Sequence, residues 1–167
     1  GRVLQETGNG VVSGAWARVC GGEHMKIRFA EKSDIEILST YDKHIRITEL
    51  ESAVSLGRVI VAEDNEILIG WLRWNLFWDN TPFMNMLFIL EQYRSSGYGR
   101  KMVAYWEKQM KTDGYHLVMT SSLSNETAQY FYRKLNYVDS GALLLPEEPL
   151  EIIFVKKLSF MKSVVEI

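Results

Sequence analysis

The stretch EQYRSSGYGRKM, residues 91–102, combines two glycines, two serines and three basic residues. It follows the apolar run FMNMLFIL, residues 83–90, which predicts a buried strand, and apolar residues at three-to-four spacing after Gly97 predict a helix. A loop between a strand and a helix N-terminus presents unpaired N–H groups and the positive end of the helix dipole. The stretch therefore favours an anion such as a pyrophosphate, although an ordinary strand-to-helix connection with exposed arginines has the same spacing.

Two common nucleotide-binding loops do not match this stretch. A P-loop requires a lysine and then a serine or threonine after its last glycine, whereas Gly99 is followed by Arg100 and Lys101. A dinucleotide fingerprint requires a third glycine at the position of Met102. A nucleotide-binding protein with a different phosphate ligand stays an alternative.

The 167 residues, 47% of them hydrophobic and 24% charged with a net charge of −2, have the composition of one globular domain. The chain has no apolar run of the roughly 20 residues that a membrane span needs. Its single cysteine, Cys20, cannot form an intrachain disulfide, which favours a cytoplasmic protein. A lone cysteine offers no cysteine set for a zinc site, and a pI near 6.0 gives no basic surface for nucleic acid, so we expect neither a metal nor a nucleic-acid partner. We also expect no membrane partner, and a homodimer is one alternative assembly.

The chain divides into three expected segments. Residues 1–24 are glycine-rich and aperiodic, so we interpret them as a leader outside the fold, either disordered or added for expression. Residues 25–158 are expected to form the domain, and residues 159–167 a C-terminal tail.

The order of patterns within residues 25–158 is typical of a mixed α/β fold. We expect a strand from Met25, a helix capped at Ser33, a helix ending at Gly57 and a β-hairpin around Asp64 and Asn65. After the strand, glycine loop and helix described above come a strand at 115–122, a helix beginning near Asn125 and a last strand at 150–158. Residues 83–121 thus form a βαβ unit.

Two motifs in this order resemble those of the GNAT superfamily of N-acetyltransferases. YRSSGYG, residues 93–99, resembles its Arg-x-x-Gly-x-Gly acetyl-CoA signature, and NETAQYFYRKLNYVDSG, residues 125–141, resembles its second hallmark. Asn136 stands where a glycine is usual, and asparagine tolerates the left-handed conformation that ends a helix. The resemblance covers residues 25–158 and implies a central, mostly antiparallel, mixed and twisted sheet of about six to seven strands flanked by about four helices.

The resemblance also implies acetyl-CoA as co-substrate and no metal. The strand backbone would pair with the pantetheine arm, the loop amides would hold the pyrophosphate, and a tyrosine would lie near the thioester sulfur. The residues expected to bind acetyl-CoA are Phe88, Ile89, Leu90, Arg94, Ser95, Ser96, Gly97, Tyr98, Gly99, Arg100, Asn125 and Tyr132.

The implied reaction moves an acetyl group from acetyl-CoA to a primary amine of a small molecule or peptide, by direct attack in a ternary complex. Tyr132 would be the general acid, because the ordinary pKa of tyrosine, near 10, keeps its hydroxyl protonated at neutral pH. Its helical spacing with Ala128, Phe131 and Leu135 also fits a core residue, and both roles are compatible.

The general base is the role for which the sequence gives the least support. Many relatives carry a glutamate on the strand before the loop, but residues 83–90 contain no acid, and Asn85 stands near that position. Glu63 or Glu91 is the candidate base, with Asp64 or a chain of waters as alternatives, although a solvated surface carboxylate explains each acid equally well.

The acceptor pocket is expected at an aromatic-rich segment, with Trp71 assigned to the core. Trp74, Phe77 and Trp78 straddle a predicted loop and, with Asn85, would line a hydrophobic or cation-binding pocket. The rival function is a non-catalytic acyl-CoA-binding module with the same fold, a hypothesis that the missing strand carboxylate motivates.

Overall fold

A seven-stranded sheet organises the computed structural model, which describes residues 25–159. The strand order is β1-β2-β3-β4-β5-β7-β6, and every neighbouring pair is antiparallel except β4 and β5. The strands are β1 (Met25–Phe29), β2 (Val59–Asp64), β3 (Ile67–Phe77), β4 (Thr81–Ile89), β5 (Leu117–Leu123), β6 (Val138–Leu143) and β7 (Glu151–Lys157). The mixed α/β class and the mostly antiparallel sheet are confirmed, whereas the leader at 1–24 and the tail from residue 160 lie outside the described residues.

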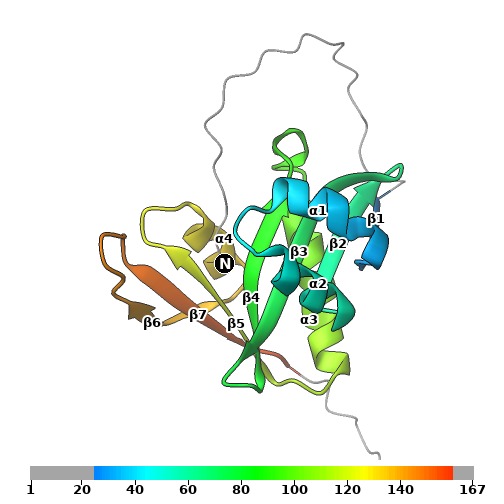
Figure 1. Cartoon of the computed structure of the whole chain (residues 1–167). Coiled ribbons are helices and arrows are strands. Elements are labelled where there is room, and N and C mark those ends of the chain that lie inside the picture. The colour runs from blue at the N-terminus through cyan, green and yellow to red at the C-terminus, as the bar shows by residue number, and fades with distance from the viewer. Residues whose placement is uncertain (1–24, 160–167) are drawn as a thin grey trace, which may run out of the picture.

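Helices cover both faces of the sheet. They are α1 (Ile35–Tyr41), α2 (Ile47–Ser55), α3 (Tyr98–Thr112) and α4 (Ala128–Lys134), with short 3-10 helices η1 (Lys32–Asp34) and η2 (Glu91–Tyr93). One core lies between the sheet and α3 with α4, and contains Met102, Trp106 and Tyr132. A second core lies between the sheet and α1 with α2, and contains Leu38 and Leu50. Figure 1 shows α1 and α2 in front of the sheet and α3 behind it. Within residues 25–159, no helix is both long enough and apolar enough to span a membrane.

Several turns form where the sequence predicts them. The β2–β3 hairpin turns at Asn65 and Glu66, with φ values of 49° and 65°. Gly57 and Gly114 follow α2 and α3 with φ values of 66° and 88°, so they end these helices in the left-handed conformation. Asn136 adopts a φ of 66° after α4, which confirms that asparagine replaces glycine there.

Three local predictions are wrong. Ser33 does not cap the first helix; Glu31 and Asp34 form the capping box instead, and the Glu31 N–H donates to Asp34 Oδ2 at 2.6 Å. Helix α4 begins at Ala128 rather than near Asn125, because residues 124–127 form turns. Strand β6 was absent from the predicted pattern because its side chains are all exposed and give no hydrophobic alternation; pairing with β7 alone makes it a strand.

A β-bulge at Asn85 decides which side chains point to which face of β4. Arg73 pairs with Met86 while Trp74 pairs with Met84, so Asn85 is the extra residue. The bulge reverses the alternation of side chains along the strand. As a result, β4 contributes to the α3 core at 84 and 87 but to the α1–α2 core at 86 and 88.

The two central strands separate just beyond this bulge. β4 and β5 are paired only at Phe83 with Met119 and at Met84 with Thr120. Beyond these pairs the strands diverge, as Figure 1 shows. We call the opening beyond Met84 and Thr120 the fork, and it exposes backbone groups of β4 that a continuous sheet would pair.

Candidate active site

The backbone of β4 presents polar groups to the fork at alternate residues. The carbonyl oxygen of Ile89 accepts a hydrogen bond from Arg94 Nε at 2.8 Å, away from β3. The Phe88 carbonyl instead faces β3, since a Cβ on Gly70 would meet its oxygen at 2.5 Å, and the Leu90 N–H donates to β3 at 2.8 Å. Of the three strand residues expected to pair with pantetheine, only Ile89 therefore faces the fork, because successive residues of a strand point their backbone groups to opposite sides.

A cavity of about 650 Å³ lies where β4, the glycine loop and two helices meet. We call it the loop cavity. It is lined by Leu87, Ile89, Tyr93, Arg94, Ser95, Gly97, Tyr98, Gly99, Arg100, Thr127, Ala128, Phe131 and Lys134. Most of the predicted loop residues therefore line one cavity. The residues predicted to bind acetyl-CoA that do not line it are Phe88, whose ring packs in the α1–α2 core, and Leu90, Ser96, Asn125 and Tyr132. The helix expected from Asn125 does reach the cavity, but through Thr127, the N-cap of α4, and through Ala128, Phe131 and Lys134, which share helical spacing, rather than through Asn125.

The N-terminus of α3 opens into the loop cavity. Ser95 and Gly97 adopt φ values of 61° and 81°, which turns the chain sharply before the helix. Gly97 is the N-cap and provides no side-chain cap, so the first-turn amides of α3 are left for a ligand or solvent. Arg100 and Lys134 add positive charge to the same cavity. The arrangement suits a phosphate or pyrophosphate group.

Tyr132 lies at the base of the fork and is fully buried. Its ring packs against Phe154 with centroids 6.0 Å apart, which confirms its place in the core. Its hydroxyl lies beside that of Thr120, which donates to the Met84 carbonyl at 3.0 Å, and it makes no hydrogen bond of good geometry among residues 25–159. Burial raises the pKa of Tyr132 well above its ordinary value, and proximity to Thr120 offsets part of the rise. The hydroxyl thus keeps its proton at neutral pH.

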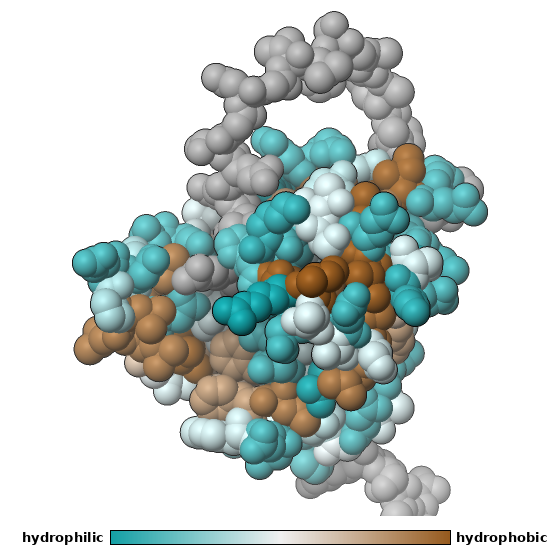
Figure 2. All heavy atoms as spheres, viewed as in Figure 1, coloured by the Kyte–Doolittle hydropathy of each residue, from teal (hydrophilic) through white to brown (hydrophobic). Residues whose placement is uncertain are grey.

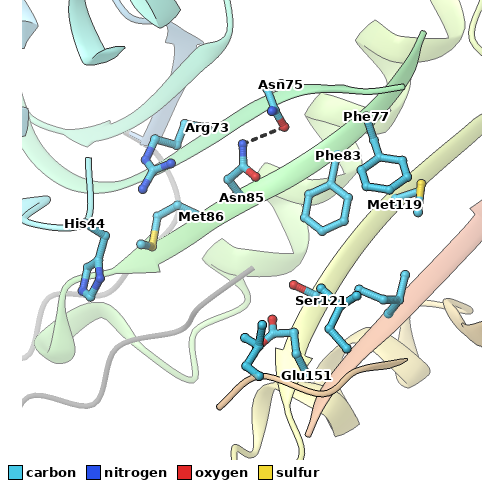
Figure 3. Close-up of a pocket in the computed structure, with 13 residues that line it drawn as sticks. His44, Arg73, Asn75, Phe77, Phe83, Asn85, Met86, Met119, Ser121 and Glu151 are labelled. Atoms are coloured by element: carbon cyan, nitrogen blue, oxygen red, sulfur yellow. Dashed lines mark hydrogen bonds between the residues drawn. The ribbon is translucent and has the colours of Figure 1, made fainter. Parts of the chain in front are cut away.

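A second cavity, of about 500 Å³, opens on the other face of β4. We call it the hairpin cavity, and Figure 3 shows its labelled side chains. It is lined by His44, Arg73, Asn75, Phe77, Phe83, Asn85, Met86, Met119, Ser121, Leu143, Leu145, Glu151 and Ile153.

Two of the four residues predicted for the acceptor pocket line this cavity, Phe77 and Asn85. Trp74 belongs to β3 rather than to a loop, and the register shift beside the bulge turns its side chain into the α3 core, 6.5 Å from Trp106 between ring centroids. Trp78 is 77% exposed in the β3–β4 turn and lines neither cavity.

Neither predicted base lies in a cavity at the fork. Glu63 accepts a hydrogen bond from the Arg28 guanidinium at the outer strands, and Glu91 is exposed in η2. The acid in the hairpin cavity is Glu151, which is 7% exposed and whose Oε2 has no hydrogen-bond partner among residues 25–159. Strand geometry places Glu151 and Ile153 on one face of the last predicted strand, but the sequence does not show that this face borders a cavity.

A buried ion pair fixes one wall of the hairpin cavity. Arg73 Nε donates to Asp42 Oδ2 at 2.7 Å, and Trp71 Nε1 donates to the same oxygen at 3.1 Å. The other oxygen accepts the backbone N–H of His44 at 3.1 Å. Asp42, 2% exposed, therefore compensates the charge of Arg73. No group of three or more His, Cys, Asp or Glu side chains within residues 25–159 could hold a metal ion.

Comparison with protein families places these motifs in a known domain. The model of the acetyltransferase (GNAT) domain matches residues 55–139, which include the fork, the glycine loop and α4. No curated protein matches the chain in sequence.

Solved structures share the fold at low sequence identity. Ard1 from Thermoplasma volcanium superposes with a TM-score of 0.72 at 12% identity, covering 83% of this chain and 100% of its own. A GNAT-family acetyltransferase from Bacillus cereus gives a TM-score of 0.68 at 20% identity, with 83% and 100% covered. YncA from Salmonella typhimurium, solved with its cofactor acetyl-CoA, gives 0.64 at 19% identity, with 82% and 95% covered.

Proposed function

Because this chain belongs to the GNAT acetyltransferase family, we propose that it transfers an acetyl group from acetyl-CoA to a primary amine of a small molecule or peptide. The observation that carries the proposal is the fork, with the loop cavity on one face of β4 and the hairpin cavity on the other. Separate cavities let both substrates be bound at once, so the amine can attack directly in a ternary complex.

The residues of the loop cavity fit acetyl-CoA, which supplies an acetyl group activated as a thioester. The first-turn amides of α3, with Arg100 and Lys134, would hold its phosphates. The backbone of Ile89 faces the fork and would pair with the pantetheine arm once Arg94 releases its carbonyl. The apolar side chains of Leu87 and Phe131 would exclude water beside that arm.

Tyr132 would supply the proton that the departing sulfur needs, and water would accept the proton that the amine nitrogen loses as the amide forms. The Tyr132 hydroxyl keeps its proton at neutral pH, makes no hydrogen bond of good geometry within the described chain and lies beside Thr120, the last residue of β5 that pairs with β4. The Ile89 N–H lies on the same fork-facing side as its carbonyl and would donate to the acetyl oxygen.

A binding module without catalysis is the second candidate, and one observation favours it. Near the strand position where the resemblance led us to expect a glutamate, the Asn85 amide donates to Asn75 Oδ1 at 2.9 Å and cannot act as a base. Release of CoA above the hydrolysis background with any amine of a test panel would exclude this candidate.

Thermal unfolding with acetyl-CoA, using ATP as the control anion, tests the co-substrate. A ligand at about 100 times its Kd stabilises the folded state by roughly 2.7 kcal/mol if it binds only that state. We expect acetyl-CoA to raise the unfolding temperature and ATP to have a smaller effect. Equal stabilisation by ATP would instead support a general nucleotide site, and no shift with either ligand would contradict the proposal.

A further inference from the structure

Glu151 is a buried acid, and the described chain supplies no hydrogen-bond partner for one of its two carboxylate oxygens. It is the first residue of β7, is only 7% exposed and lines the hairpin cavity. Its Oε2 accepts no hydrogen bond within residues 25–159. An unpaired buried carboxylate oxygen is costly, so such a group in a cavity wall indicates a ligand that pairs with it.

The charges around the cavity indicate the sign of that ligand. Among the described residues, the acidic and basic side chains that line it are Glu151, Arg73 and His44. Arg73 is already paired with Asp42 at 2.7 Å, so its charge is compensated inside the protein. The carboxylate of Glu151 therefore leaves the cavity with an excess negative charge, which favours a cation.

Between these groups the wall is apolar. Phe77, Phe83, Met86 and Met119 line the cavity, and Figure 3 shows Phe77, Phe83 and Met119 grouped together and Met86 beside Asn85. Leu143, 50% exposed, lies at the rim, where Figure 2 shows apolar side chains gathered over the end of β6. A ligand with a flat or bulky apolar body would bury this surface on binding.

We propose that the acceptor is a small cationic amine with an apolar, aromatic-sized body, and that Glu151 binds its ammonium group. This inference rests on the proposed function, because it assigns the hairpin cavity to the acceptor. An amine that carries its own carboxylate should bind less well. Arg73 is already paired with Asp42, and the negative charge of Glu151 would repel a ligand carboxylate in the same cavity.

Titration calorimetry in the presence of CoA tests the inference without turnover. The probes share one body: 2-phenylethylamine is cationic, 2-phenylethanol is uncharged and phenylalanine is zwitterionic. We expect the wild-type chain to bind 2-phenylethylamine at least about tenfold more tightly than the other two probes. Glu151→Gln should lose that preference while its binding of 2-phenylethanol stays unchanged.

Two further variants separate a local effect from misfolding. Glu148 is an exposed acid of the loop between β6 and β7, three residues before Glu151, and it does not line the cavity. The Glu148→Gln variant should therefore bind all three probes as the wild type does. Leu143 pairs with Glu151 across β6 and β7 and is half exposed, so Leu143→Lys should fold normally and neutralise the carboxylate. It should weaken 2-phenylethylamine binding about as much as Glu151→Gln does.

The outcomes distinguish this inference from the proposed function. Equal binding of 2-phenylethylamine by the wild type and Glu151→Gln, no binding to the wild type, or tighter binding of phenylalanine each overturns the inference. Failure of CoA itself to bind overturns the proposed function instead, and titration of the same probes without CoA then decides the role of Glu151 separately.

Discussion

Tyr132 has a buried hydroxyl group that contributes no hydrogen bond of good geometry to the described fold, residues 25–159. The hydroxyl lies beside Thr120, and the rest of the side chain packs as an ordinary core aromatic. A purely structural role would be served equally well by phenylalanine, so the retained hydroxyl points to chemistry at the fork.

Tyr132→Phe separates these two roles. We expect kcat to fall about 100-fold, the usual size of a lost proton transfer, with little change in KM for acetyl-CoA. Stability should stay constant or rise by up to about 1 kcal/mol, because the variant removes a buried unpaired hydroxyl. Steady-state kinetics and urea unfolding measure both effects, and an unchanged kcat would remove Tyr132 from the mechanism.

Asp42 contributes to stability through the pair that it forms. Asp42→Asn would leave the Arg73 guanidinium buried without its counter-charge, which typically costs about 3 to 5 kcal/mol. Urea unfolding should show this loss, whereas Asp139→Asn, which breaks the exposed pair with Arg133, should unfold almost as the wild type does. Similar losses in both variants would contradict the special role of the buried pair.

At the residue scale, the sequence predicts the backbone conformation at positions where the residue type alone determines it. Gly57, Gly114 and Asn136 end helices because few other residues adopt a positive φ. The environments of Glu151 and Trp74 were not predicted, because they depend on partners that are distant in the chain. Glu151 pairs with a residue of β6, and the side-chain direction of Trp74 depends on the register shift between β3 and β4.

The backbone conformation of Gly97 at the start of α3 shapes the wall of the loop cavity. Gly97→Ala meets no steric obstacle, but the φ of 81° should cost about 1 to 2 kcal/mol in an alanine. Gly114→Ala is a matched control, because its φ of 88° and open surroundings impose the same cost at the other end of the helix. Both variants should unfold at lower urea concentration, but only Gly97→Ala should weaken acetyl-CoA binding in a calorimetric titration. Equal acetyl-CoA affinity in the two variants would contradict the assignment of the loop.

An ion cluster joins the first strand to the first helical turn. Arg28 donates to Asp34 at 2.7 Å and also to Glu63 of β2, so it connects β1, η1 and β2. Its guanidinium lowers the pKa of Asp34 below the ordinary value. A carboxyl group whose pKa is lower in the folded state stabilises the fold above its unfolded pKa, and this contribution disappears as pH falls through the folded pKa.

Comparison with Asp34→Asn measures this pH dependence. Near pH 7 the variant should unfold at a lower urea concentration than the wild type, because it lacks the charged partner of Arg28. The difference should shrink as pH falls below about 4, where the wild-type carboxyl also becomes protonated. A difference that is constant down to about pH 2 would show that the carboxylate charge does not contribute.

At the element scale, the βαβ unit was predictable, whereas the fork was not. A strand, a glycine loop and a periodic helix are each local patterns, and their order implies the parallel β4–β5 pair. The bulge at Asn85 leaves no signal in composition, because it arises from the mutual register of β3 and β4. That one extra residue changes which β4 side chains point to which face of the sheet.

The whole molecule presents the two cavities to solvent on opposite faces of one strand. This arrangement explains how the chain could admit a large anionic donor and a small cationic acceptor without competition for the same groups. The homodimer and the cytoplasmic location suggested by the sequence stay predictions, since the described residues belong to one chain.

Acetyl transfer itself is the measurement that tests the account most directly. The wild-type protein would be incubated with acetyl-CoA and a panel of primary amines that includes 2-phenylethylamine, while free CoA thiol and N-acetylated product are quantified together. We expect thiol and acetylated amine to appear in equal amounts, well above hydrolysis, for at least one amine. Thiol release that no amine accelerates, in a protein that binds acetyl-CoA, would contradict the enzyme and leave the binding module.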